Sequence, residues 1–233
     1  YEEKKMEEME VCFLMDRFGY MKLIDKNAYE RNKEAVHNEN KYVFNCMNTD
    51  KICIFTDTGK MHTIKAVDIP LGRFRDKGTP VDNLSNYDSS QERMLYVAPV
   101  GQLRSDRLLF VTKTSMCKLV EGAEFDVAKR TIASTKLADE DELIFIGSAS
   151  EMEQIVLQSH GGCFLRFLTQ EVSTMKKTAL GVRGMKLADD DYLEHAYLLA
   201  GHQEYTISYH DKEYALNKVR LAKRDTKGIK PRI

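Results

Sequence analysis

Basic residues recur in short groups beside glycine or threonine, and such groups could bind phosphate. The first group is Arg73, Arg75 and Lys77, directly before Gly78. Lysine and arginine neutralise phosphate charge, while a small residue lets backbone N–H groups approach a phosphate oxygen. Three later groups share this character: Lys129 and Arg130; Lys176, Lys177, Arg183 and Lys186; and Lys218, Arg220, Lys223, Arg224 and Lys227. The pattern predicts contacts to a duplex DNA backbone. The alternative is ordinary charge scattered over exposed turns.

Residues for catalysis do not form a recognisable constellation. The histidines show no metal-ligand spacing with cysteine or glutamate, and the glycines do not form a GxxxxGK[ST] loop. A GxSxG nucleophile motif is also missing. No stretch reads as a recognition helix, so reading of bases in the major groove is not expected. The sequence therefore predicts a chain that is not an enzyme by itself and holds no metal or cofactor.

Composition narrows the class of protein. The 233 residues carry a formal net charge of −1, which argues against a uniformly basic DNA binder but allows segregated patches. The five cysteines are an odd number without a CxxC pair, which predicts reduced thiols in a cytoplasmic protein. No apolar run reaches the roughly 18–20 residues of a membrane span, so no membrane partner is expected. The acidic residues 1–10 read as a tail or linker, the one stretch that could be helical, and the absence of an initiator Met suggests a fragment.

A repeated segment reveals how the basic groups are positioned. Residues 136–143 (KLADEDEL) return as residues 186–193 (KLADDDYL), 50 positions later. A period of about 20–50 residues indicates a solenoid, a propeller or an array. The acidic triplets inside both copies are expected to be solvated turn residues before the next strand.

Apolar hairpins recur between these segments. Four clear units span residues 11–24, 52–64, 108–120 and 155–167, and a weaker fifth spans 196–209. Their turns are centred on residues 19, 59, 115, 161 and about 203, and the residue four before each of the first four centres is apolar. Alternating strands around a tight turn indicate β-hairpins. The sequence therefore predicts an all-β, propeller-like disc of about five four-stranded blades over residues 11–233, with five or six blades both possible.

Three motifs resemble a known family, the C-terminal domain of type IIA bacterial topoisomerase A subunits. They are Phe18–Lys22, Thr56–Lys60 with the following Ile64–Gly78, and Lys176–Leu187. The resemblance covers about residues 8–233. It implies a β-pinwheel whose rim binds and bends duplex DNA without sequence preference and presents a segment for ATP-dependent strand passage. It also implies a cytoplasmic, nucleoid-associated protein whose partners are the N-terminal cleavage domain of the same polypeptide, which carries the cleaving tyrosine, and the ATPase B subunit.

The resemblance leaves two parent enzymes open, DNA gyrase and topoisomerase IV. Gyrase carries a glycine-rich basic box after its first hairpin, and the matching stretch Glu30–Val36 has neither the paired glycines nor the basic density. This departure favours a topoisomerase IV-like subunit. Two other functions stay open: a propeller-type protein–protein scaffold using the hairpin turns, and, with little support, a propeller hydrolase with a central site.

Overall fold

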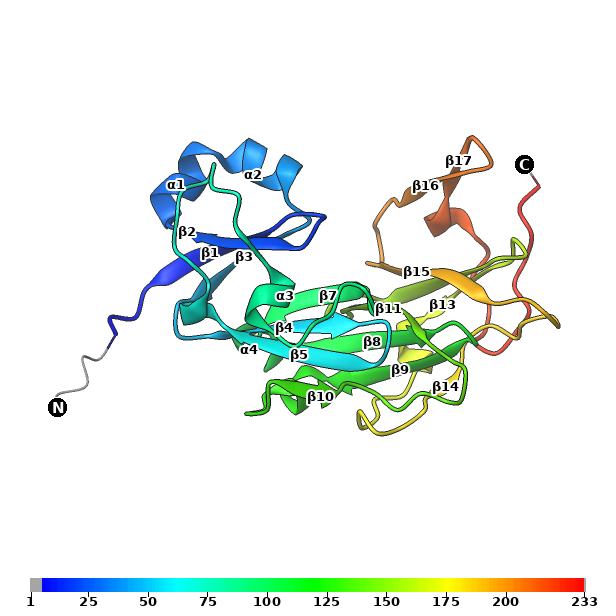
Figure 1. The fold of residues 1–233 in the computed structure, drawn as a ribbon. Helices are drawn as coiled ribbons and strands as arrows, with labels where there is room; N and C mark the ends of the chain where they lie inside the picture. Colours follow the sequence, from blue (N-terminus) through cyan, green and yellow to red (C-terminus); the bar gives the residue numbers. More distant parts are fainter. Residues whose placement is uncertain (1–5, 233) are drawn as a thin grey trace.

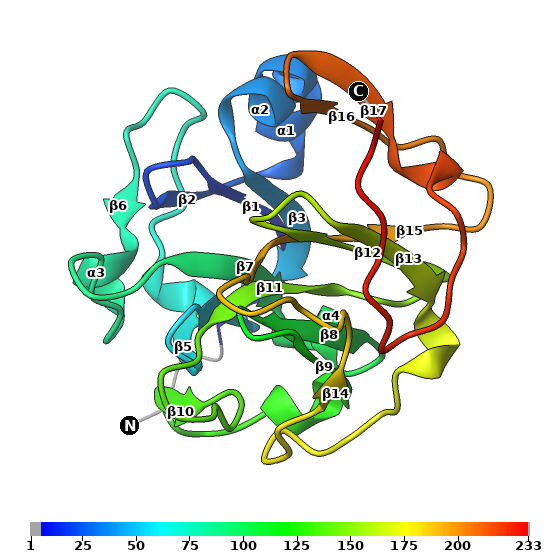
Figure 2. The same ribbon diagram turned by 90° about the vertical axis from the view of Figure 1, so that its right-hand side faces the viewer.

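Five β-hairpins follow one another around a centre in the computed structural model, which describes residues 6–232 (Figures 1 and 2). Continuous apolar strands joined by tight turns produce them, as the sequence indicates. Their strands are β1 (Glu10–Met15) and β2 (Tyr20–Ile24), β4 (Lys51–Thr56) and β5 (Lys60–Lys65), β8 (Arg107–Thr112) and β9 (Met116–Glu121), β12 (Gln154–Ser159) and β13 (Phe164–Leu168), and β16 (Thr206–Tyr209) and β17 (Lys212–Ala215).

Each hairpin except the last gains an inner strand from the chain that follows it. The inner strands are β3 (Tyr42–Met47), β7 (Met94–Pro99), β11 (Leu143–Ser148) and β15 (Leu193–Leu199). Each pairs antiparallel with the first strand of its own hairpin, as β7 does with β4. β3, β7 and β11 lie near the middle of the molecule in Figure 2.

Each outer strand belongs in sequence to the following blade. β6 (Thr79–Pro80) leaves the second hairpin and pairs with β2 of the first. β10 (Thr131–Ala133) and β14 (Val182–Arg183) cross in the same way to β5 and β9. The sheets therefore run β3-β1-β2-β6, β10-β5-β4-β7 and β11-β8-β9-β14. This exchange of strands between neighbours is the β-pinwheel arrangement, and the predicted all-β fold class is confirmed.

The last two blades have fewer strands than the expected four. The fourth sheet has three strands, β13-β12-β15, and its outer edge is met by single bridges from Leu221 and Ile229 to Arg166 and Phe164. The fifth has the two strands of its hairpin.

Both faces of the first four hairpins are buried, because neighbouring blades, or the helical pair in the case of the first hairpin, pack against them. On β4, Ile52 and Ile54 join a core shared with the first blade, while Cys53 and Phe55 join a core shared with the third. On β12, Ile155 packs against the third blade and Val156 packs against the fifth. Two-sided burial explains why these strands are continuous apolar runs and not simple alternations.

A helical pair covers the outer face of the first hairpin. α1 (Lys26–Arg31) and α2 (Lys33–Glu39) follow the second strand of the first hairpin. In the later blades the chain at this point crosses to the preceding blade. Ala28 and Val36 pack on Cys12 and Leu14 of β1. Asp25 caps α1 by accepting a hydrogen bond from the backbone N–H of Ala28 at 2.7 Å. Two single-turn helices, α3 (Val81–Leu84) and α4 (Val100–Leu103), join later strands. The expectation of helix only in residues 1–10 was wrong: residues 6–9 have no regular structure, Glu10 begins β1, and residues 1–5 lie outside the described residues.

Two expected turn positions need correction. In the fourth hairpin the residue with positive φ is Gly162 (φ 88°) and not Gly161, so the residue four before it is the polar Gln158. The fifth hairpin lies at residues 206–215 and not 196–209, because residues 196–199 belong to β15 and pair with β12. Its turn uses His210 and Asp211, both at positive φ (51° and 61°), as a two-residue type I′ turn requires.

Glycine holds three of the four crossing chains against the preceding hairpin. Gly78, Gly181 and Gly228 have φ of 86°, 105° and 75°. A Cβ at any of them would lie 2.6 Å from a backbone oxygen, that of Met21, Cys117 or Phe164 respectively. Each glycine also stands twelve residues after the start of a short 3-10 helix (Ala66, Thr169 and Leu216). The crossing is therefore built in the same way in three places, and only glycine fits it.

Gly181→Ala is expected to lower the free energy of unfolding by about 3 kcal/mol or more, because it combines an unfavourable φ with a backbone collision. Gly59→Ala is the matched control: Gly59 has a similar φ of 78°, but its added Cβ would meet only side chains, and Ser115 already occupies the equivalent turn at φ 74°. Its expected cost is about 1 kcal/mol. Urea unfolding of both variants measures the difference, and equal losses would show that the close approach is unimportant.

Candidate nucleic-acid interface

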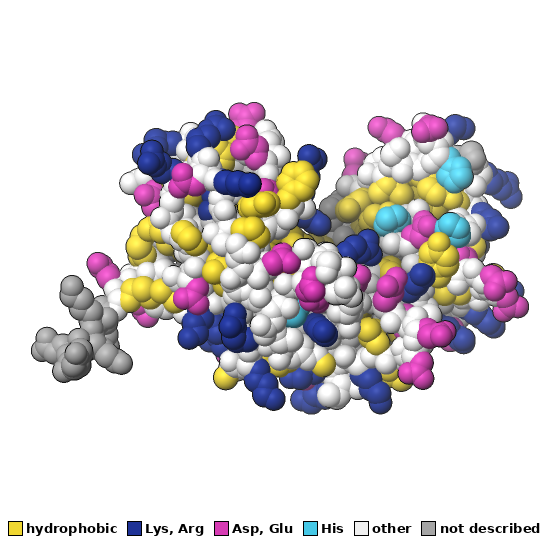
Figure 3. All heavy atoms as spheres, in the orientation of Figure 1, with side chains coloured by type: hydrophobic (Ala, Val, Ile, Leu, Met, Phe, Trp, Pro, Cys, Tyr) yellow, Lys and Arg dark blue, Asp and Glu magenta, His cyan; other side chains and the backbone are white. Residues whose placement is uncertain are grey.

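Most of the predicted basic residues lie on the segments that cross from one blade to the outer edge of the preceding blade. We call residues 72–78, 126–131, 175–181 and 222–228 the exchange loops. They run along the periphery of the disc, next to β6, β10 and β14 (Figure 2). Lys and Arg side chains line the lower edge of the molecule in Figure 3, over β5, β10 and β14. Most of the predicted cations therefore lie on or next to the rim, in a chain whose net charge is −1, although Lys and Arg side chains also cover α1 and α2 (Figure 3).

Two lysines, Lys118, which is buried, and Lys22, which is half-buried, fix the course of the third and first of these loops. Lys118 of β9 donates hydrogen bonds from Nζ to the backbone oxygens of Lys177 (2.7 Å) and Ala179 (2.6 Å). Lys22 of β2 does the same to Phe74 (2.5 Å) and Asp76 (2.7 Å), at the equivalent places of the first loop. An ammonium group that accepts no hydrogen bond suits a pair of carbonyls that point inward. The loops are thus held from inside, and their side chains turn outward.

The second blade uses a different device at the same position. His62 stands three residues after the turn centre, as Lys22 and Lys118 do in their hairpins. It is buried, and its Nε2 lies 2.9 Å from a carboxylate oxygen of Glu92. Its Nδ1 lies 3.0 Å from Oγ1 of Thr131, the first residue of β10. Thr131 also stands where the other loops have glycine. These positioning residues were missed from sequence, although their constant distance from the turn is a usable signal.

One cation recurs at the same place in three exchange loops. Arg73, Lys176 and Lys223 each stand five residues before the glycine of the crossing. All three are exposed, and their side chains make no hydrogen bond or ion pair with another residue between 6 and 232. The second crossing lacks this cation: it is three residues shorter when counted from the start of its 3-10 helix (Gly122) to Thr131, and the residue five before Thr131 is Asp126. The structure therefore places three predicted residues at equivalent points of the rim with their charge available.

Six further predicted cations are also exposed and available. Lys77 lies over the ring of Tyr20, with its Nζ 5.0 Å from the ring centroid. The other five have side chains without a hydrogen-bond or ion-pair partner in the described part of the chain: Lys129, Lys186, Lys218, Arg220 and Lys227.

Five predicted cations are held by protein partners. Arg224 donates to the backbone oxygens of Glu171 and Arg183, and Lys177 donates to that of Glu124. Arg183 forms a two-bond ion pair with Asp225, with Nε 2.5 Å from Oδ1. Arg183 and Arg224 thereby join the fourth exchange loop to the third crossing segment and β14, whereas Lys177 joins the third exchange loop to the segment before the second.

The remaining two are held more loosely. Arg130 donates to the backbone oxygen of Leu84 at 3.1 Å. Arg75 lies 3.8 Å from Glu39 and stacks on Phe74, but its side chain is 77% exposed, so this ion pair is weak.

The acidic triplets end in a residue with a structural role. Asp141 accepts hydrogen bonds from the backbone N–H and the hydroxyl of Thr114, in the turn of the third hairpin. Asp191 accepts one from the backbone N–H of Gly161, in the turn of the fourth. The first two residues of each triplet are exposed, as expected, whereas the third is half-buried. The triplets therefore fasten inner strands to hairpin turns.

Other reactive groups do not assemble into a centre. All five cysteines are free, as predicted, and burial raises the pKa of Cys53 to about 12, far from a reactive thiolate. Residues 6–232 contain no group of three or more histidine, cysteine or acidic side chains placed to hold a metal ion. Within the same residues, no helix is long and apolar enough to cross a membrane.

Comparison with known proteins gives a consistent set of relatives. The family model described as the DNA gyrase C-terminal domain, beta-propeller, matches residues 50–89, 106–150 and 153–200. The chain is 25% identical over 236 residues to the DNA gyrase A subunit of Ureaplasma parvum, and 27% identical over 240 residues to that of Mycoplasma pneumoniae. Each alignment covers 94% of this chain and 28% of the relative, so the chain spans less than a third of these gyrase polypeptides.

Solved structures agree on the fold. A C-terminal domain of DNA topoisomerase IV superposes with a TM-score of 0.83 at 22% identity, covering 97% of this chain and 73% of that one. The E. coli ParC C-terminal domain superposes with a TM-score of 0.74 at 13% identity, covering 96% and 94%.

The burial of Lys118 predicts a pH dependence of stability. Burial lowers the pKa of Lys118 to about 8, whereas an unfolded lysine keeps its proton to about pH 10.4. Between these values the unfolded state binds more protons, so the contribution of Lys118 to the free energy of unfolding rises with pH. We expect the difference in this free energy between wild type and Lys118→Met to shift in favour of wild type between about pH 7.5 and 10, measured by urea unfolding.

Lys22→Met is the matched comparison. Burial also lowers the pKa of Lys22, but Asp16, Asp76 and Glu39 oppose the effect, so a smaller shift over the same pH range is expected. A wild-type-minus-Lys118→Met difference that does not change with pH would contradict a desolvated lysine at this position.

Proposed function

This chain belongs to the DNA gyrase C-terminal domain β-propeller family, and we propose that it binds duplex DNA along its rim and bends it. The bent segment would be presented to a type II topoisomerase for ATP-dependent strand passage. The partners in this role are the DNA-cleaving region of the same polypeptide and the enzyme's ATPase subunit. The chain itself supplies no cleavage chemistry in this proposal.

The recurrence of one exposed cation in three exchange loops is the observation that carries the proposal. Arg73, Lys176 and Lys223 are placed by the same crossing geometry at equivalent points of the first, third and fourth sheets, where they would meet a curved backbone. Contacts of this kind neutralise phosphates without touching bases, which makes binding strong, dependent on salt and indifferent to sequence. Bendable DNA would be preferred, because wrapping a disc costs deformation energy.

The region after the first hairpin supports bending without a full chiral wrap. Glu30–Val36 lies in α1 and α2, whose surface mixes acidic and basic residues. The glycine-rich basic box that the gyrase version of the family uses for wrapping is missing from this stretch. We therefore propose a role closer to the topoisomerase IV type, in which a DNA segment is captured and curved.

The triple variant Arg73→Gln/Lys176→Gln/Lys223→Gln should weaken binding to every duplex sequence alike. Removing three phosphate contacts lowers the slope of log affinity against log salt by about 2.7, and lowers affinity on the order of 100-fold near 0.1 M salt. Filter binding across a salt series measures both quantities.

The control is Arg17→Gln/Lys113→Gln/Lys212→Gln, which removes the same charge at the hairpin tips: Arg17 and Lys113 lie in turns, and Lys212 begins β17. It should change the slope by much less. If the control lost more affinity than the rim variant, the hairpin turns would be the binding face. If wild type bound no duplex DNA at physiological salt, a protein–protein scaffold would replace the proposal.

Bending predicts faster ring closure of a short DNA. A fragment of about 150 base pairs, close to one persistence length, resists cyclisation on its own, so saturating protein should raise its ligation into circles many-fold. Nicked plasmid religated with the protein should keep the linking-number distribution of free DNA. A shifted distribution would show chiral wrapping and its handedness, against the proposed role.

A further inference from the structure

Exposed apolar side chains accompany the cations of the rim. Nine large apolar residues between 6 and 232 are well exposed, and four of them lie in an exchange loop or directly beside one, although these loops are a small part of the chain. The four are Leu71, Leu180, Leu221 and Ile229. A single exposed leucine is ordinary in a folded protein. A group of them on one basic surface suggests a partner with both charged and apolar parts.

Leu71 and Leu221 occupy equivalent positions in the first and fourth crossings. Each stands seven residues before the glycine of its crossing. Each forms a parallel bridge with the residue four after the glycine of a hairpin turn, Leu23 or Arg166. In both cases the residue after the leucine donates its backbone N–H to the oxygen of that hairpin residue, at 2.9 and 2.8 Å. The two leucines are therefore held on a fixed backbone, while their side chains are 54% and 44% exposed.

Each of these leucines shares its side of the chain with an available cation. Arg73 follows Leu71 by two residues, and Lys223 follows Leu221 by two. The residue between them is half-buried in both loops, whereas the leucine and the cation are exposed. Alternate residues of an extended segment point to the same side, and two such residues span roughly 6–7 Å. The rim therefore presents the same apolar and cationic pair twice.

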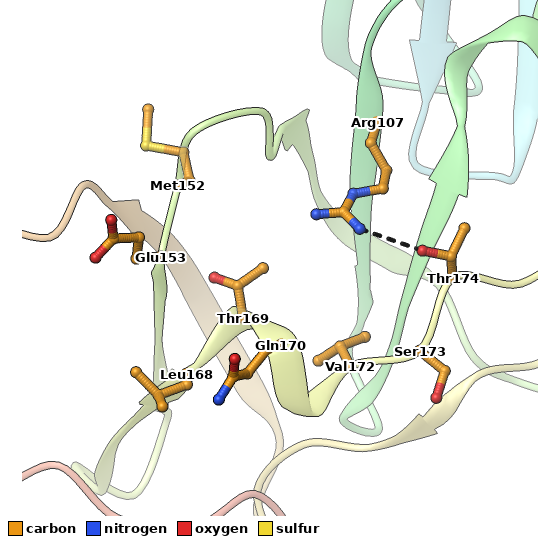
Figure 4. Close-up of a pocket in the computed structure, with 9 residues that line it drawn as sticks. All are labelled: Arg107, Met152, Glu153, Leu168, Thr169, Gln170, Val172, Ser173 and Thr174. Carbon is orange, nitrogen blue, oxygen red and sulfur yellow. Dashed lines mark hydrogen bonds between the residues drawn. The ribbon is translucent and has the colours of Figure 1, made fainter.

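The third crossing uses the leucine's position differently. Thr174 stands there, at the edge of the cavity drawn in Figure 4, and its Oγ1 accepts a hydrogen bond from Nη1 of Arg107 at 3.4 Å. This side chain thus contacts the third hairpin. The exposed leucine of this loop, Leu180, comes four residues after Lys176 and is not equivalent to the other two. The repeated pair belongs to the first and fourth crossings.

The mixture of leucine and free cation fits a DNA backbone better than a protein surface. The buried centre of a protein–protein interface is depleted of charged residues, and of lysine in particular. Along a DNA strand, in contrast, phosphates alternate with deoxyribose, which presents C–H groups and has no 2′-hydroxyl. Nucleotides of one strand follow each other every roughly 3.4 Å of helix axis. A cation on one phosphate therefore leaves a leucine 6–7 Å away, roughly two nucleotide steps, within reach of a nearby sugar.

We propose that Leu71 and Leu221 pack on deoxyribose of the bound duplex while Arg73 and Lys223 meet nearby phosphates. The inference rests on the proposed function for its ligand and adds a contact that does not depend on salt. It also gives the rim a preference for DNA over RNA. In an RNA duplex a 2′-hydroxyl would lie against the leucine, and burying a hydroxyl without a partner is unfavourable.

The double variant Leu71→Ala/Leu221→Ala separates this contact from rim electrostatics. It should bind duplex DNA about three- to tenfold more weakly at every salt concentration, because it loses apolar contact area. The slope of log affinity against log salt should stay as in wild type, since no phosphate contact is lost. Filter binding across a salt series measures both quantities. Both side chains are exposed, so urea unfolding should show wild-type stability.

Two matched variants serve as controls. Leu71→Met/Leu221→Met keeps an apolar side chain of similar size at both positions and should keep wild-type affinity. Met9→Ala/Met47→Ala removes two apolar side chains, each 39% exposed, that lie outside the exchange loops. It should leave DNA affinity unchanged.

Duplex RNA of the same base sequence tests the sugar contact. Wild type should prefer DNA, and Leu71→Ala/Leu221→Ala should lose part of this preference, because its affinity for RNA changes less than its affinity for DNA. Equal losses on both duplexes, or a lower salt slope, would overturn the deoxyribose contact. Unchanged DNA affinity in the alanine variant would overturn the inference while leaving the proposed function intact. A wild type that binds no duplex DNA would overturn both.

Discussion

The rest of the structure depends on the exchange of outer strands between neighbouring blades. A hairpin with an inner strand alone would leave the edge of its second strand open, and open edges invite pairing with other chains. β6, β10 and β14 close these edges, and each is delivered by the following blade. The delivering chain has to travel around the periphery and back. That path creates the exchange loops, so the positive rim is a consequence of how the sheet edges are closed.

Closing the edges in this way determines the backbone path of the exchange loops and the direction of their side chains. The loop must approach the hairpin so closely that Gly181 leaves no room for a side chain, and its carbonyls must turn inward to Lys118. Once the backbone carbonyls point inward, alternate side chains have to point outward. Arg73 and Lys176 each precede a residue whose carbonyl points inward to Lys22 or Lys118, and their side chains are exposed. Lys223 is exposed at the equivalent place of the fourth loop. A rigid, repeated presentation of this kind reduces the entropy lost when the cations meet a phosphate backbone.

The sequence predicts the first four blades well, because each hairpin has apolar residues on both faces and a turn residue in the middle. The fifth was misplaced: residues 196–199 are as apolar as a hairpin strand, whereas the true turn at His210 and Asp211 has no glycine to reveal it. The helices α1 and α2 were missed since each buries a single residue. For the candidate site, the sequence shows where the cations stand along the chain but not which of them form ion pairs. The Arg183–Asp225 ion pair joins positions 42 apart, and only the crossing of two loops brings them together.

Charge segregation explains how a chain of net charge −1 can present a basic rim. The same repeat contains both signs, basic in the exchange loop and acidic shortly afterwards. The fold sends the two parts to different places. The cations stay at the periphery, while Asp141 and Asp191 accept hydrogen bonds in the hairpin turns, where backbone N–H groups need an acceptor. Because Asp141 and Asp191 are placed by backbone N–H groups and not by the cations, they do not neutralise the rim; Asp225, which lies in the fourth exchange loop, pairs with Arg183. Long-range repulsion in the free protein stays small, and attraction toward a polyanion is concentrated along one curved path.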